Sequence, residues 1–80
     1  MQQPLKKLSR IRPYQIDLLT ARERQIARIM AEGLTNKEIA QRLKLAEGTV
    51  KAHIQAIFRA LNVTTRVQAV VAAGKLGIKA

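Results

Sequence analysis

The fold is decided by residues 35–61, which read TNKEIAQRLKLAEGTVKAHIQAIFRAL. Thr35 and Glu38 form the T-x-x-E pattern of a capping box, in which side chains accept hydrogen bonds from the free backbone N–H groups at a helix start. The pattern predicts a helix over 36–43, a turn of about three residues, and a longer helix over 47–61. Apolar residues recur in the longer helix every three or four positions, as expected of a helix that buries one face. They are Val50, Ile54, Ile57 and Leu61.

Two further capping patterns flank this stretch, at residues 20–23 and 65–68. They predict helices over 21–32 and 66–75. Glycines follow where a helix can end, because glycine readily adopts the left-handed backbone conformation. These glycines are Gly33, Gly74 and Gly77. The sequence therefore predicts an all-α fold, a compact bundle of four helices that contains a helix-turn-helix.

Residues 1–19 differ from the rest of the chain, because Pro4 and Pro13 interrupt any helix and basic residues accompany them. We expect a linker or basic arm over 1–19 and an ordered domain over 20–80. The length of 80 residues suits one small domain. The hydrophobic share of 48% is enough for a packed core and excludes a disordered basic tail.

The charge of the chain favours a polyanionic partner. It carries 15 Lys and Arg against five Asp and Glu, a formal net charge of +10. Nucleic acid is the first candidate and an anionic membrane the second. A membrane-surface peptide would need one amphipathic helix with clustered charge, whereas here the charge is spread over four predicted helices. No apolar run is long enough to span a membrane, and we expect a cytoplasmic protein without a membrane partner.

Several other chemistries are disfavoured by the residue types present. Only Tyr14 and Phe58 are aromatic, which argues against stacking of single-stranded bases. With no cysteine, a single histidine, His53, cannot build a zinc site, and we expect it to pack at the edge of the apolar stripe or to form a hydrogen bond. Glu23 and Glu38 are explained by their capping positions. We therefore expect no cofactor, no metal and no enzymatic activity.

The helices over 36–43 and 47–61 fit the design of a DNA-reading helix-turn-helix. All four base pairs can be distinguished only in the major groove, and a helix lying there needs a second helix packed closely across it, for which Ala40 is small enough. The outer face of 47–61 has no acidic residue, whereas a merely solvated face would usually mix both charges. That face carries Lys51, Ala52, Gln55, Ala56 and Arg59. A corner between two bundle helices with a solvated outer face is the alternative.

Four segments resemble the signature of LuxR/FixJ-type helix-turn-helix domains. They are LTARE at 19–23, GLTNKEIA at 33–40, GTVKAH at 48–53 and NVTTR at 62–66. The resemblance covers residues 19–78 in the family's order and spacing. Region four of sigma factors is similar around the middle two helices. That region usually lacks a histidine two residues after Thr-Val-Lys, and it lacks an arginine at the entry to a fourth helix. This chain has both, at His53 and Arg66.

The resemblance implies a sequence-specific, double-stranded DNA-binding domain of a bacterial transcription regulator. It implies that the third helix reads the major groove through Lys51, Ala52 and Gln55. Lysine can donate to guanine, glutamine can pair with adenine, and alanine can contact the methyl group of thymine. The resemblance also implies contacts with DNA phosphates. The candidate residues are Thr35, Asn36, Lys37, Thr49, Arg59 and Arg66.

One position departs from the family. A serine or a similar residue often caps the third helix of these domains, whereas this chain has Ala46. Loss of a capping hydrogen bond costs about 1 kcal/mol. We therefore expect the start of the third helix to be less stable than a capped start.

The predicted helix over 66–75 is apolar on almost all sides. A helix with one buried face should carry charge on its outer side. The resemblance implies that this helix forms a homodimer on two inverted DNA half-sites about one helical turn apart, and dense packing within one chain is the alternative. The expected interface residues are Val67, Ala69, Val70, Ala72 and Ala73.

Double-stranded DNA is the expected partner, and RNA polymerase is a further candidate. A helical adaptor for an acidic protein is the rival interpretation. Members of the family usually place a receiver or ligand-sensing domain before the linker. We expect this chain to be the C-terminal part of such a regulator, which its linker-like start favours, or a small stand-alone regulator of the spore-regulator kind.

Overall fold

A computed structural model describes residues 19–78 and contains four α-helices. They are α2 (Ala21–Ala31), α3 (Asn36–Leu43), α4 (Glu47–Leu61) and α5 (Arg66–Lys75). No strand occurs among these residues, so the predicted all-α fold is confirmed. The bounds agree with the prediction except that α2 ends one residue early, because Glu32 is its C-cap. The predicted arm lies almost wholly outside the described residues.

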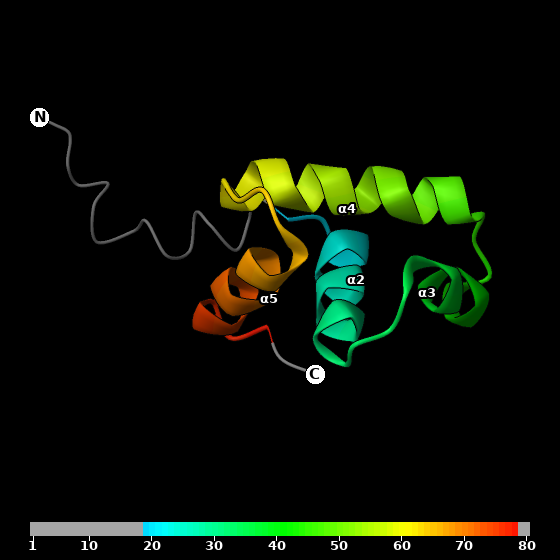
Figure 1. The fold of residues 1–80 in the computed structure, drawn as a ribbon, viewed down its shortest axis with the longest axis horizontal. Helices are drawn as coiled ribbons and strands as arrows, with labels where there is room; N and C mark the ends of the chain where they lie inside the picture. Colours follow the sequence, from blue (N-terminus) through cyan, green and yellow to red (C-terminus); the bar gives the residue numbers. More distant parts are fainter. Residues whose placement is uncertain (1–18, 79–80) are drawn as a thin grey trace, which may run out of the picture.

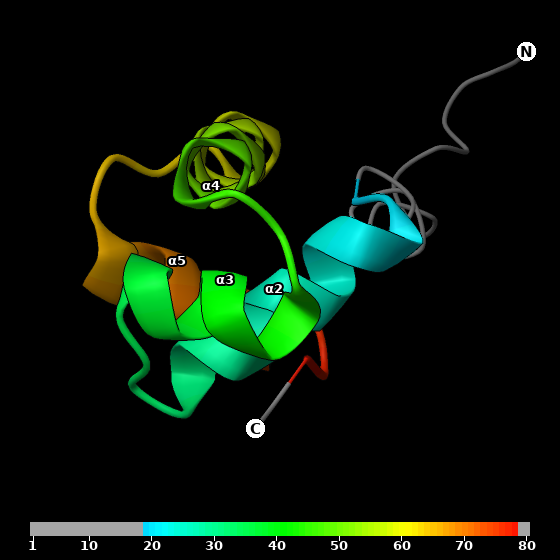
Figure 2. The same ribbon diagram turned by 90° about the vertical axis from the view of Figure 1, so that its right-hand side faces the viewer.

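The longest helix, α4, lies across the other three. Figure 1 shows the first turn of α4 beside α3 and its last turns beside α5, with α2 between them. The end-on view in Figure 2 shows one side of α4 facing the other helices and its opposite side facing away from them. This arrangement buries one face of α4 and leaves the other open along the helix.

The core is apolar, since no polar or charged residue between 19 and 78 is buried. The predicted stripe of α4 supplies its centre, with Val50 and Ile57 fully buried and Ile54 5% exposed. Burying side chains of this size is worth about 1.5–3 kcal/mol each. The other core residues are Leu19, Ile26, Ala27, Ile29, Met30, Ile39, Ala40, Ala69, Ala73 and Ile78.

One of these residues corrects a predicted boundary. Leu19, expected to end the arm, is 2% exposed and belongs to the core. Its backbone carbonyl accepts a hydrogen bond from the guanidinium of Arg24 at 3.2 Å. The ordered domain therefore includes Leu19, because an apolar residue just before the first helix completes the packing beneath it.

The three predicted capping boxes are all present. The Oγ1 atoms of Thr20, Thr35 and Thr65 accept hydrogen bonds from the backbone N–H of the residue three positions later, at 3.0, 3.2 and 3.2 Å. The reciprocal hydrogen bonds from the backbone of each threonine to the side chain of Glu23, Glu38 or Gln68 also form. Helix α4 is the exception, because its N-cap residue, Ala46, makes no side-chain hydrogen bond.

Helix α5 ends in a Schellman motif around Gly77. Gly77 adopts φ 88°, and the N–H of Ile78 donates to the carbonyl of Ala73 at 2.9 Å. This turn brings Ile78 back into the core beside Ala73. Gly77 thus ends the helix as predicted, whereas Gly74, the other expected stop signal, lies within it.

Candidate DNA-binding surface

Helices α3 and α4 are joined by the short turn Lys44-Leu45-Ala46. Lys44 adopts the left-handed conformation (φ 58°), and the N–H of Leu45 donates to the carbonyl of Ala40 at 2.9 Å. Ala40 itself is 5% exposed within the core. The predicted turn and the placement of a small residue in the packed interior of the motif are therefore confirmed.

The three predicted base-reading residues lie together on α4. Lys51, Ala52 and Gln55 are all exposed, and they alternate along the helix with the buried Val50 and Ile54. Within residues 19–78, neither Lys51 nor Gln55 has a hydrogen-bond or ion-pair partner. The donor groups of both side chains are therefore available to an external ligand.

The exposed side of α4 extends this surface in both directions. Thr49 near its start and Arg59 near its end are exposed, and neither side chain has a polar partner within the described residues. Ala56, which was expected to be exposed on the same side, is half-buried instead. Glu47 is the one acidic residue of α4 and occupies the first helical position, where a carboxylate is favoured by the helix dipole.

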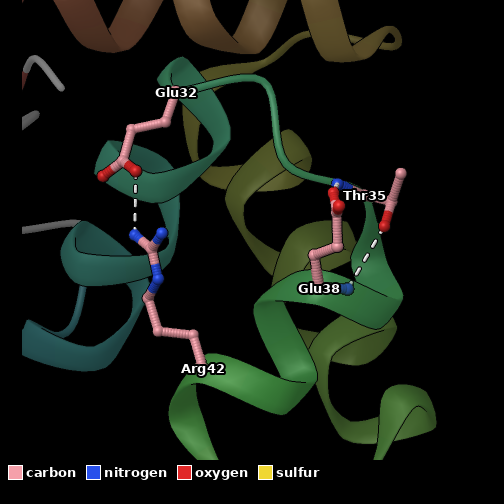
Figure 3. Close-up of polar contacts among 4 residues, drawn as sticks. All are labelled: Glu32, Thr35, Glu38 and Arg42. Atoms are coloured by element: carbon pink, nitrogen blue, oxygen red, sulfur yellow. Dashed lines mark hydrogen bonds and ion pairs between the residues drawn. The ribbon is translucent and has the colours of Figure 1, made fainter.

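The start of α3 supplies a second group of predicted DNA contacts. Lys37 is exposed, whereas Thr35 is largely engaged in its own capping box (Figure 3). The N–H of Thr35 donates to Oε1 of Glu38 at 2.8 Å, and its Oγ1 accepts from the N–H of Glu38 at 3.2 Å. Of these two side chains, the Lys37 ammonium is therefore the one that is free to contact an external ligand.

The two acidic side chains near α3, Glu32 and Glu38, each form a polar contact with a neighbouring residue. The hydrogen bond from the backbone of Thr35, helped by its side chain and by the charge of Arg42, holds the pKa of Glu38 below its ordinary value. Glu32, at the end of α2, forms an ion pair with Arg42 across 2.8 Å (Figure 3). Each acidic residue thus has a local structural role.

Arg66 is placed differently from the other predicted phosphate ligands. It is half-buried at the start of α5, and Nη1 donates to Oδ1 of Asn36 at 2.8 Å. Nη2 donates to the backbone carbonyl of Leu34. The guanidinium group is therefore already bonded within the protein, with partners that lie 30 and 32 positions away in the sequence.

The predicted interface on α5 divides into two sets. Ala69 and Ala73 are each 1% exposed, and this corrects the expectation that they face a partner, because both fill the core of the same chain. Val67 is 73% exposed, and Val70 and Ala72 are half-buried. Val71, which is not among the predicted interface residues, is 53% exposed. Val71 lies one turn after Val67 on the same helix face, but the sequence alone could not mark that face as the exposed one.

A groove of about 360 Å³ runs beside these valines, between the end of α2 and α5. Its lining is mainly apolar. The lining residues are Met30, Gly33, Arg66, Val67, Val70 and Val71. The exposed valines and the groove together make an apolar patch on the α5 side of the molecule.

No group of three or more metal-ligating side chains gathers within residues 19–78. His53 is half-buried on α4. No helix in this range is long and apolar enough to cross a membrane.

Comparisons with known proteins agree with this geometry. Residues 17–73 match the family described as "Bacterial regulatory proteins, luxR family". The chain is 44% identical over 68 residues to the glycerol metabolism activator of Pseudomonas putida, covering 85% of this chain and 31% of that protein. It is 43% identical over 56 residues to the nitrate/nitrite response regulator protein NarL of Escherichia coli (strain K12), covering 70% and 26%. The chain thus spans less than a third of the length of these two relatives.

A solved structure shows the same fold. The structure of the transcription factor GerE superimposes with a TM-score of 0.73 at 36% sequence identity, covering 79% of this chain and 94% of that one. The family match, these relatives and this fold lead to one conclusion. This chain belongs to the LuxR family of bacterial regulatory proteins, and it is a helix-turn-helix DNA-binding domain of a transcription regulator rather than an enzyme.

Proposed function

We propose that this domain recognises specific double-stranded DNA by placing α4 in the major groove. The observation that carries the proposal is the exposed face of α4, where Lys51, Ala52 and Gln55 lie together without an internal polar partner. The opposite face is anchored in an apolar core, so the helix can present these side chains without reorganising the fold. This is how a rigid element holds a reading surface in place.

The three side chains suit three different base contacts. Lys51 donates to the O6 and N7 acceptors of guanine, and Gln55 pairs with N6 and N7 of adenine. Ala52 has no polar group and contacts the methyl group of thymine. Each well-formed polar contact would discriminate against a wrong base by about 1–3 kcal/mol.

Phosphate contacts would flank this reading surface. Lys37 and Asn36 lie at the start of α3, where free backbone N–H groups also favour an anion, and Thr35 can add its hydroxyl group. Thr49 and Arg59 lie near the two ends of α4. Such contacts set the register on the duplex without reading its sequence.

The α5 side of the domain is proposed as a homodimer interface. Large exposed apolar residues are costly to leave in water, and Val67 and Val71 are the two such residues in the described region. A twofold contact through them, with Val70 and Ala72 at its edge, would place two α4 helices on inverted half-sites about one helical turn apart. A contact with RNA polymerase, expected from the resemblance, stays a prediction.

The test is selection from a random duplex library at about 150 mM salt, with sequencing of the bound pool. We expect an inverted repeat, because each half-site would be read by one α4. Gln55→Ala and Lys51→Ala should relax the preference at single positions and cost about 1–3 kcal/mol each. Arg59→Ala should weaken all sequences alike, and Lys75→Ala, at the end of α5, is the charge-matched control.

Three results would contradict the proposal. A bound pool without an enriched motif would mean that the domain binds DNA only through its charge. Unchanged preferences in Gln55→Ala and Lys51→Ala would mean that α4 is not the reading helix. If neither duplex competitor nor added salt weakened binding, the result would instead favour a protein partner.

A further inference from the structure

Arg66 connects two parts of the domain that are distant in sequence. It is the first residue of α5, and its guanidinium donates one hydrogen bond to the Asn36 side chain at 2.8 Å and another to the carbonyl of Leu34. Leu34 precedes the N-cap of α3, and Asn36 is its first helical residue. The start of α5 is therefore bonded directly to the start of α3.

The geometry of this contact requires arginine. A guanidinium presents its donors in a fixed planar fork, so two acceptors can be engaged at once, while a lysine ammonium cannot match both positions in the same way. Hydrogen bonds from a charged donor are also stronger than neutral ones. The contact thus depends on the shape of the side chain as well as on its charge.

The contact also determines what Asn36 can offer to a ligand. An asparagine amide has one acceptor oxygen and one donor NH₂ group. Because Oδ1 of Asn36 accepts from Arg66, the amide is held with its Nδ2 donor free. A donor is the group that a phosphate oxygen needs.

We propose that Arg66 is a positioning residue for DNA binding, which holds the start of α3 and orients the Asn36 amide instead of contacting a phosphate itself. The proposal rests on the proposed function above, since it assigns the oriented amide to the DNA backbone. It replaces the direct phosphate contact that the resemblance implied for Arg66, because one N–H group of each terminal nitrogen donates within the protein and thereby holds this half-buried side chain at the start of α3.

The test is a double-mutant cycle on DNA affinity, measured over a range of salt concentrations. The variants are Arg66→Lys, Asn36→Ala and the combination of both, with Lys37→Ala as the reference for a direct phosphate contact. Thermal unfolding checks whether each variant is folded. The NMR signals of the Asn36 side-chain amide in the free protein report whether its contact with Arg66 has been lost.

We expect Arg66→Lys to shift the Asn36 amide signals and to weaken binding about 3- to 10-fold, the effect of one hydrogen bond. Asn36→Ala should weaken binding by a similar factor. In the Asn36→Ala background Arg66→Lys should cost less than it costs alone, because only its contact with Leu34 then remains to be lost. The salt slope should stay unchanged in Arg66→Lys, whereas Lys37→Ala should reduce it by about 1.

Three outcomes would overturn the proposal. Wild-type affinity in Arg66→Lys would show that only the charge matters, as for a direct phosphate ligand. Additive losses in the double variant would show that Arg66 stabilises the fold without acting through Asn36. A wild-type domain that binds no DNA would refute the proposed function and this assignment together, whereas the first two outcomes refute the assignment alone.

Discussion

The uncapped start of α4 offers the sharpest prediction about stability. Ala46 has the extended backbone of an N-cap residue (φ −69°, ψ 146°), close to that of Thr35 at the start of α3 (φ −75°, ψ 166°). A serine at position 46 therefore needs no backbone change to accept a hydrogen bond from the first turn of α4. Ala46 is also exposed, so the added hydroxyl meets no packed neighbour.

We expect Ala46→Ser to stabilise the domain by about 1 kcal/mol, the typical value of an N-cap hydrogen bond. For a domain of about 60 residues this corresponds to a rise in Tm of roughly 4–8 °C. The measurement is thermal unfolding followed by circular dichroism. Ala21→Ser is the matched control, because it adds a hydroxyl at the exposed first position of α2, where Thr20 already provides the cap.

An unchanged or lowered Tm in Ala46→Ser, with a wild-type Tm in Ala21→Ser, would refute this prediction. Such a result would mean that α4 does not begin at Glu47 in solution, or that water satisfies its first N–H groups equally well. A rise of the same size in both variants would mean that any exposed serine stabilises the domain, and capping would not be the cause.

Two further predictions concern charge. Glu38 has a lowered pKa in the folded domain, so its ionised form contributes stability above the unfolded value of about 4.3, and this contribution is lost as the pH falls through the folded value. In Glu38→Gln the new glutamine should form the same kind of capping box that Gln68 forms in α5. The fall of Tm below about pH 4.3 should therefore be less steep in this variant than in the wild type. A fall as steep as that of the wild type would contradict this linkage. Val71→Glu should leave the fold intact but place a charge in the proposed dimer interface. Because two linked domains bind paired half-sites roughly 10²- to 10⁴-fold more tightly than one domain binds a single half-site, the variant should lose most of this gain in affinity. Gel-shift titration on single and paired half-sites measures this, with Gln25→Glu on α2 as the charge-matched control, and undiminished binding to paired sites would refute the interface.

The helices themselves were predictable from local chemistry. A capping box involves residues only three positions apart, so Thr20, Thr35 and Thr65 mark three helix starts before any tertiary contact is considered. The exposed face of α4 was also predictable, because its apolar residues recur at the helical period and leave Lys51 and Gln55 on the other side. Local spacing was therefore sufficient for the helix-turn-helix and its exposed surface.

Three features were decided only by tertiary structure. Helix α5 is apolar nearly all round, so its sequence periodicity could not distinguish the buried Ala69 from the exposed Val71. The packing of α5 against α2 and α4 determines which of its residues are buried. Leu19 joined the core because a neighbouring surface was there to bury it. Arg66 found its partners across 30 or more residues of chain, and no local pattern encodes a contact between groups that only folding brings within 3 Å.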